Sequence, residues 1–168
     1  EQKSERDPIP RGNSMRITVF VDSDHAHDQK TCRSITGLLG FIGCTPIMAR
    51  AKRQTSVETS TYGAEFSAAR SAVEYITGMR LLLRSLGVPV NGPSVLLGDN
   101  RGVVLSATQF TSVLTKKHHA ISYHKVRECI AAGIVDFRWI DGDNNLADLM
   151  TKPVTKATQA TLLKRFMH

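Results

Sequence analysis

The chain has 168 residues, of which 41% are hydrophobic and 22% charged, and its 22 basic against 15 acidic residues give a net charge of +7. This composition indicates one ordinary globular domain and excludes disordered, collagen-like and coiled-coil chains. No apolar stretch approaches the roughly 20 residues needed to span a bilayer, and no secretory leader opens the chain, so we expect an intracellular protein without a membrane partner. The three cysteines form no CxxC pair and favour neither a disulfide framework nor a cysteine zinc site.

Residues 1–14 differ in composition from the rest of the chain. They carry three basic and three acidic residues, two prolines, and Ile9 as their one large apolar side chain. Such a segment cannot bury enough surface to fold by itself, which predicts a flexible linker or tether. It also lacks an initiator methionine, so we expect a piece excised from a longer polypeptide, with a tag remnant as the alternative. Residues 15–168 are then the folded domain, including a C-terminal helical tail.

The first half of the domain predicts three strands and a long helix. Residues 16–22 alternate apolar and polar side chains with the period of two that is typical of a strand. Residues 36–44 and 46–52 are two further strand-like runs around a turn, which indicates an antiparallel hairpin. From Tyr62 to Leu86 apolar residues recur every three or four positions, with a Ser/Thr cap before them and Gly87 after them, as in an amphipathic helix.

The second half predicts alternating strands and helices. Residues 94–98 form a short apolar run that ends at Asp99, as expected for a buried parallel strand. A short helix over 101–107, a helix over 120–132, a strand over 135–139 and a helical region from about Asn145 follow. This order indicates an α/β fold, a mixed sheet with helices packed against it.

Four carboxylates lie at the ends of these predicted elements, where packing does not require an acid. Asp22 ends the first strand and Asp99 ends the central one, while Glu65 and Asp148 fall in the first turns of two helices. Ligands of open α/β sheets gather beyond the carboxyl ends of the strands, so we expect these side chains to converge. Taken singly, each acid is more often a turn residue or a complement to the helix dipole.

A convergent group of four carboxylates requires cations, because like charges without matching bases repel. Hard oxygen ligands select Mg²⁺ or Mn²⁺ over zinc. Two such ions activate water and stabilise the leaving oxygen in phosphodiester hydrolysis. An acidic centre within a basic domain is what a metal-dependent nuclease needs, so the residues themselves favour that class of enzyme.

Five segments, in order, resemble the ribonuclease H domain at the end of the polyprotein of copia-type LTR retrotransposons. The match covers roughly residues 20–155, and each motif is weak alone but strong in this sequence of five. The segments are VDSDHAHDQKTCRSITG, KRQTSVETSTYGAEFSA, LLGDN, TKKHHAISYHKVRE and NNLADLMTKP.

The resemblance implies a ribonuclease H-like fold with a five-stranded mixed sheet flanked by helices. It also implies that Asp22, Glu65, Asp99 and Asp148 form a catalytic site for two Mg²⁺ ions, with Mn²⁺ as the other candidate ion. The implied activity is in-line endonucleolytic cleavage of the RNA strand of RNA/DNA hybrids during reverse transcription. The implied partner is the reverse transcriptase domain of the same polyprotein, in the cytoplasm within virus-like particles.

Further residues are candidates for contacts with nucleic acid or for accessory roles. Asn100 is a candidate for the minor groove, although an asparagine at this position is equally typical of a helix cap. Exposed bases are more often merely solvated than bound to phosphate, and the ones best placed to follow the backbone are Lys52, Arg53, Arg101, Lys116 and Lys117. Asp24 rivals Asp22 because both have the same strand parity. The resemblance also makes His118 or His124 a candidate proton carrier for product release.

Two alternatives remain open at this point. The first is a non-catalytic nucleic-acid-binding or connection-type module of the same fold, which the presence of all four acids disfavours. The second is a transposase or integrase strand-transferase. Those enzymes place their third acid on a late helix, whereas the glutamate here falls on the first long helix.

Overall fold

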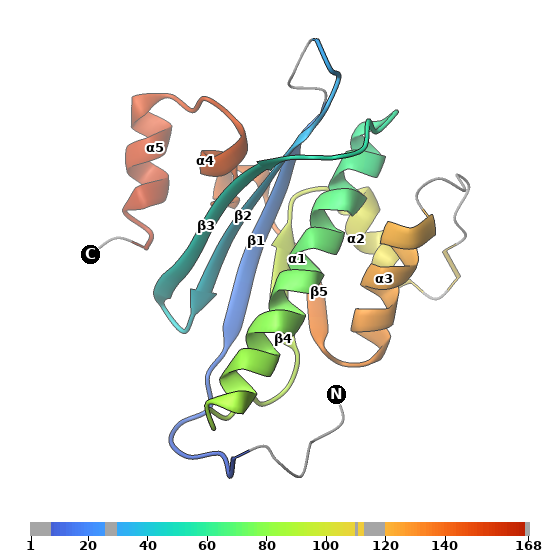
Figure 1. Ribbon diagram of the computed structural model, residues 1–168. Helices are drawn as coiled ribbons and strands as arrows, with labels where there is room; N and C mark the ends of the chain where they lie inside the picture. Colours follow the sequence, from blue (N-terminus) through green and yellow to red (C-terminus); the bar gives the residue numbers. More distant parts are fainter. Residues whose placement is uncertain (1–7, 26–29, 110, 113–119, 167–168) are drawn as a thin grey trace.

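The computed structural model describes residues 8–25, 30–109, 111–112 and 120–166. Its centre is a five-stranded sheet in the order β3-β2-β1-β4-β5 (Figure 1). Strands β1, β2 and β3 pair antiparallel, and β1, β4 and β5 pair parallel. The strands are β1 (Ile17–Asp24), β2 (Ile35–Ile42), β3 (Thr45–Arg53), β4 (Ser94–Gly98) and β5 (Val135–Trp139). The predicted five-stranded mixed sheet is confirmed.

Helices cover both faces of this sheet. Figure 1 shows α1 and α3 on one side and α4 and α5 on the other. The helices are α1 (Thr61–Ser85), α2 (Arg101–Thr108), α3 (Ala120–Ala131), α4 (Asp148–Thr151) and α5 (Lys156–Leu163), with a 3₁₀ turn at Gly142–Asn144. Within the described ranges no helix is both long and apolar enough to cross a membrane.

The larger core lies between the sheet and the helices α1, α2 and α3. Alternate residues of β1, among them Val19 and Val21, point to this side and are at most 2% exposed. Helix α1 supplies the opposing apolar stripe through residues such as Phe66 and Ile76, which are fully buried. The Ser60 side chain accepts a hydrogen bond from the Gly63 amide and caps the helix, satisfying one of its free N–H groups.

A smaller core on the opposite face holds the C-terminal helices in place. Phe41 of β2 makes edge-on ring contacts with Phe20 at 5.8 Å and with Phe166 at 5.7 Å between centroids. Leu146 and Leu162 pack into the same cluster and are 5% and 3% exposed. This second core anchors the segment around α4 against β1 and β2, which decides where Asp148 lies.

Three of the differences from the predicted element boundaries bear on the site. Strand β1 continues past Asp22 to Asp24, because the ladder with β2 extends to the pair Asp24 and Ile35. Ser60 caps α1 so that the helix begins at Thr61, which moves Glu65 out of the first turn. The single C-terminal helical region is instead two helices, α4 and α5, because Pro153 follows α4 and cannot continue a helix.

The described part of the N-terminal segment, residues 8–14, contains no helix or strand and is exposed. Two hydrogen bonds connect it to the loop after α1. The Arg11 amide donates to the Gly87 carbonyl at 2.9 Å, and the Asn91 amide donates to the Ser14 hydroxyl at 3.1 Å. The division into a tether over 1–14 and a domain over 15–168 stays a prediction.

Candidate metal centre

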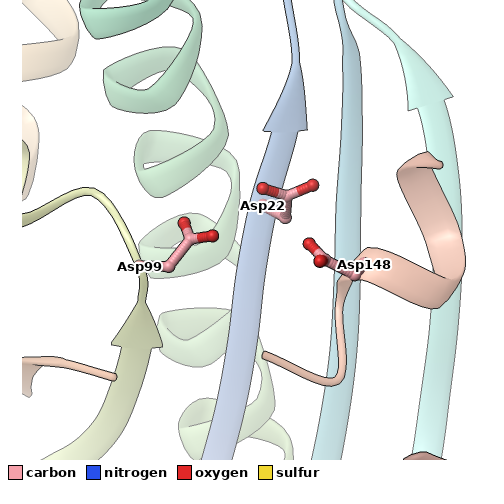
Figure 2. A group of neighbouring side chains, drawn as sticks. All are labelled: Asp22, Asp99 and Asp148. Carbon is pink, nitrogen blue, oxygen red and sulfur yellow. The ribbon is translucent and has the colours of Figure 1, made fainter. Parts of the chain in front are cut away.

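Three carboxylates from distant parts of the chain meet at one edge of the sheet. Asp22 lies on β1, Asp99 directly follows β4, and Asp148 is the first residue of α4. One oxygen atom from each of the three lies within 4.8 Å of the others. Figure 2 shows the Asp99 and Asp148 carboxylates turned toward that of Asp22. Because β1 and β4 are parallel neighbours, Asp22 and Asp99 reach the same edge of the sheet.

Glu65, the fourth predicted acid, lies beside this group without being part of it. It occupies the second turn of α1, and only 7% of its surface is exposed. Burial, followed by the negative charges of Asp22 and Asp99, raises its pKa to about 8. Glu65 is therefore electrostatically coupled to both aspartates, and in the metal-free protein it holds its proton at neutral pH.

The charges of Asp99 and Asp148 are also disfavoured by their surroundings. Burial, and then the nearby charge of Asp22, raises the pKa of the Asp99 carboxyl. Burial is the first cause that raises the pKa of Asp148 as well, although a hydrogen bond from Lys152 opposes it. This group of carboxylates thus carries more negative charge than its surroundings stabilise, and such an excess favours the binding of a cation.

Two residues that sequence reasoning missed hold Asp22. The Thr151 hydroxyl donates a short hydrogen bond to the Asp22 carboxylate. The Lys152 ammonium lies 3.0 Å from an oxygen of Asp148 and 3.3 Å from an oxygen of Asp22. Both residues belong to the NNLADLMTKP segment, so the signal was present in the motif, but only its aspartate had been assigned a role.

Asn145 is a third residue that was missed, apart from marking the start of a helical region. It is completely buried, and its side-chain amide donates to the Val21 carbonyl at 3.0 Å. Its side-chain oxygen accepts from the Ala147 amide at 3.2 Å, and a hydrogen bond from Asn145 stabilises the charged form of Asp99. The side chain of Asn145 thus connects β1, the residue before α4 and Asp99, and we infer that it positions the acids.

The group of acids fits a hard divalent cation. All of its ligand atoms are carboxylate oxygens, which Mg²⁺ and Mn²⁺ prefer and which zinc sites combine with nitrogen or sulfur. Oxygens of the three aspartates lie within 4.8 Å of one another, a separation at which these residues could hold a metal ion. The chemistry of the residues therefore agrees with a magnesium-type site.

The candidate nucleic-acid contacts that the structure describes lie in two different places. Lys52 and Arg53 are exposed on the edge strand β3, where they line a groove of about 250 Å³ against α1 together with Arg50. Arg101 begins α2 and lies over the ring of Trp139 at 5.2 Å. The Asn100 side-chain oxygen caps α2 by accepting from the Val103 amide at 3.2 Å, so the helix-cap alternative describes its observed contact.

Neither of the two accessory candidates that the structure describes belongs to the group of acids. Asp24 lies near the end of β1 and does not belong to the group of three converging carboxylates. His124 is exposed on α3, where its ring contacts that of Tyr123 edge-on at 5.2 Å. Lys116, Lys117 and His118 lie outside the described residues.

Comparisons with known proteins agree with this geometry. No protein-family model matches the chain. The retrovirus-related Pol polyprotein from transposon RE1 of Arabidopsis thaliana is 27% identical over 148 residues, which are 88% of the chain and 10% of that polyprotein. The chain thus spans about a tenth of the curated relative that it matches.

Solved structures with the same fold include ribonucleases H. RNase H1 from Halobacterium salinarum NRC-1 superimposes with a TM-score of 0.61 at 14% identity, covering 81% of this chain and 94% of that one. LC11-RNase H1 in complex with an RNA/DNA hybrid gives 0.59 at 15% identity, with coverages of 81% and 94%. Prototype foamy virus protease-reverse transcriptase gives 0.53 at 12% identity, covering 98% of this chain and 22% of that one. The chain is therefore a homologue of the retrovirus-related Pol polyproteins of transposons, and its fold is that of ribonuclease H.

Proposed function

We propose that this chain is the ribonuclease H domain of a copia-type Pol polyprotein and that it hydrolyses the RNA strand of RNA/DNA hybrids. The observation that carries the proposal is the convergence of Asp22, Asp99 and Asp148 at one edge of a ribonuclease H fold. A binding module gains nothing from a cluster of negative charge in its own site, since phosphates repel it. The cluster therefore supports an enzyme.

Asp22, Glu65, Asp99 and Asp148 would together hold two Mg²⁺ ions in the proposed site. Bound ions of this kind activate a water molecule and neutralise the charge that develops on the scissile phosphate. Mn²⁺ satisfies the same oxygen ligands. The protein contributes the placement of the four carboxylates and their ionisation.

The ionisation of Glu65 is the step that this chain itself controls. Its pKa of about 8 in the metal-free protein means that it must release a proton before it can act as an anionic ligand. Asn145 and Thr151 meanwhile fix the orientation of the strand and carboxylate of Asp22. The site is consequently preorganised by hydrogen bonds, while its full negative charge develops only when cations arrive.

The basic side chains supply the binding of the polyanionic substrate. Arg50, Lys52 and Arg53 line one side of a groove beside α1, which suits the phosphates of one strand. Arg101 follows Asp99 by two residues in the chain and provides a further cation for the proposed binding surface. Selection of RNA must depend on its 2′-hydroxyls. The side-chain oxygen of Asn100 caps α2, and the N–H groups of the same amide can donate to a sugar or a base.

The wider setting follows from the relatives. A chain that spans a tenth of a Pol polyprotein is proposed to act beside the reverse transcriptase domain of the same polyprotein. That domain would contribute much of the binding affinity for the hybrid. The pair would act within cytoplasmic virus-like particles.

A cleavage assay tests this function. The protein is incubated with labelled RNA/DNA hybrid, double-stranded RNA or double-stranded DNA, in Mg²⁺, Mn²⁺ or EDTA. An Asp99→Asn variant removes the charge of one converging carboxylate without changing its shape. The matched control is Glu128→Gln, an exposed acid on α3 that forms an ion pair with Lys125.

We expect cleavage of the RNA in the hybrid that disappears with EDTA and with Asp99→Asn but persists with Glu128→Gln. Tight binding of the hybrid without any cleavage would instead identify a connection-type module. Joining of DNA ends would identify a strand-transferase of the same fold. Either result contradicts the proposal.

A further inference from the structure

A positive side chain lies within the acidic cluster itself. The Lys152 ammonium is 3.0 Å from an Asp148 oxygen, 3.3 Å from one Asp22 oxygen and 3.4 Å from the other. These are two of the three carboxylates whose oxygens converge. The ammonium therefore contacts oxygen atoms that a divalent cation at this site must also contact.

The backbone around α4 places Lys152 at this point. Lys152 follows Asp148 by four residues, the spacing at which side chains meet on one helical face, and its amide donates to the Asp148 carbonyl at 3.0 Å. The preceding residue, Thr151, is itself bonded to Asp22. The backbone of Lys152 is therefore held in place by its own bond to Asp148 and by the bond of Thr151 to Asp22, and its side chain extends toward the cluster from there.

The exposure of the three partners shows which of them can leave. The Asp22 side chain is 1% exposed and that of Asp148 is 21% exposed, whereas the lysine side chain is 41% exposed. Lysine has a flexible four-carbon stem, so its ammonium can move into solvent without a change in the backbone. The lysine is therefore the member of this group that can leave the other two most easily.

Ammonium and magnesium ions compete for these oxygens. Mg²⁺ requires oxygen ligands at about 2.0–2.1 Å in near-octahedral geometry, and an ammonium group needs its own acceptors at about 2.7–3.2 Å. Two positive charges held against the same carboxylates also repel each other. Binding of one cation therefore weakens binding of the other.

We propose that Lys152 is a built-in counter-cation, which offsets part of the negative charge of Asp22 and Asp148 in the metal-free protein and is displaced when a divalent ion binds them. Burial lowers the pKa of the lysine, but the charges of Asp22 and Asp148 and their hydrogen bonds raise it above its ordinary value. The ammonium thus stays charged at neutral pH. This inference rests on the proposed metal site and adds a competitor for it.

Direct measurement of metal binding in the absence of nucleic acid tests the proposal. Free Mn²⁺ is counted by electron paramagnetic resonance during titration of the full chain at physiological ionic strength. The variants are Lys152→Met, which keeps an apolar stem of similar length, and Lys152→Arg, which keeps the charge. The control is Lys164→Ala, which removes an identical charge from an exposed position after α5.

We expect Lys152→Met to bind Mn²⁺ roughly three- to tenfold more tightly than the wild type, because it lacks the competing cation. Lys164→Ala should stay within about twofold, and the difference between the two variants should persist when added salt shortens the Debye length to about 3 Å. Lys152→Arg should bind no more tightly than the wild type. In EDTA the midpoint of thermal unfolding should fall for Lys152→Met and be recovered by added Mn²⁺.

The outcomes separate this inference from the proposed function. If the wild type binds Mn²⁺ and Lys152→Met binds it equally or less tightly, the counter-cation role is wrong while the metal site stands. If neither protein binds Mn²⁺, the metal site and the inference both fail. Binding by Lys152→Met alone would be the strongest support, because it would show that the lysine holds the site closed to metal.

Discussion

Gly37 lies directly beneath Thr151, and a β-carbon at Gly37 would come within 2.5 Å of the Thr151 methyl carbon Cγ2. The added β-carbon would also lie 2.9 Å from the Ala147 carbonyl oxygen. Gly37 is also the residue that pairs with Asp22 in the ladder between β1 and β2. The missing side chain therefore lets α4 approach the sheet closely enough for Asp148 to reach Asp22.

Substitution of Gly37 by alanine should displace α4 and open the acidic cluster. We expect a loss of about 1–3 kcal/mol in the free energy of unfolding, as for overpacked cores, together with weaker Mn²⁺ binding and loss of cleavage. Urea denaturation and the Mn²⁺ titration measure the two effects.

The control is Gly78→Ala, because Gly78 is exposed on α1 and a β-carbon there meets nothing within 4 Å. That change should raise the free energy of unfolding by about 0.5–1 kcal/mol through helix propensity and leave Mn²⁺ binding unaltered. Equal behaviour of the two alanine variants would show that α4 does not depend on the gap at Gly37.

The raised pKa of Glu65 predicts a pH dependence of stability in the metal-free protein. Between its unfolded value of 4.5 and its folded value of about 8, the unfolded chain has lost this proton and the folded protein has kept it. The stabilisation is therefore complete below pH 4.5 and is lost as pH rises toward 8. The slope is at most about 1.4 kcal/mol per pH unit for this group.

Glu65→Gln isolates that contribution, since the amide stays neutral at every pH. In EDTA the variant should match the wild type near pH 4.5 and exceed it in free energy of unfolding near pH 8. Glu74→Gln, on the exposed side of the same helix, should follow the wild type at both pH values. A wild-type curve that rises steadily toward pH 8 would show that Glu65 is already ionised in the folded state.

Much of the fold was predictable because its signals are local. The alternation in β1, the apolar stripe of α1 and the left-handed glycine Gly87 each reveal an element within a short window of sequence. The break between α4 and α5 was harder to predict, because α4 has only four residues and no periodicity. Its position depends on packing against β2, which is a contact between distant parts of the chain.

The site was predictable to a similar extent. Parallel strands bring their carboxyl ends to one edge, so the meeting of Asp22 and Asp99 follows from topology. The partners Asn145, Thr151 and Lys152 act through contacts across more than 120 residues of sequence, and no spacing reveals such pairs. The burial of the Glu65 side chain was also not predictable from the sequence, because a one-residue shift in the start of the helix changes the turn to which Glu65 belongs.

Asn145→Ala should loosen the segment that carries Asp148. The substitution removes the buried hydrogen bond that the Asn145 side chain donates to the Val21 carbonyl and the bond that stabilises charged Asp99. We expect a loss of about 1–3 kcal/mol in the free energy of unfolding and weaker Mn²⁺ binding at neutral pH. Urea denaturation measures the first effect, with the exposed Asn91→Ala as control. An unchanged free energy of unfolding would contradict the positioning role.

The double variant Lys52→Ala/Arg53→Ala should weaken binding of RNA/DNA hybrid through the loss of phosphate contacts. Fluorescence anisotropy in EDTA measures binding without cleavage, and the logarithm of the affinity is plotted against that of the salt concentration. Each lost phosphate contact reduces the slope by about 0.9 in duplex-like nucleic acid, so two contacts should reduce it by about 1.8. The control is Arg16→Ala/Lys164→Ala, which removes the same charge from exposed positions outside the groove lined by Arg50, Lys52 and Arg53. If both double variants lower the affinity and the slope equally, the hybrid responds to net charge alone and the groove beside α1 is not its binding surface.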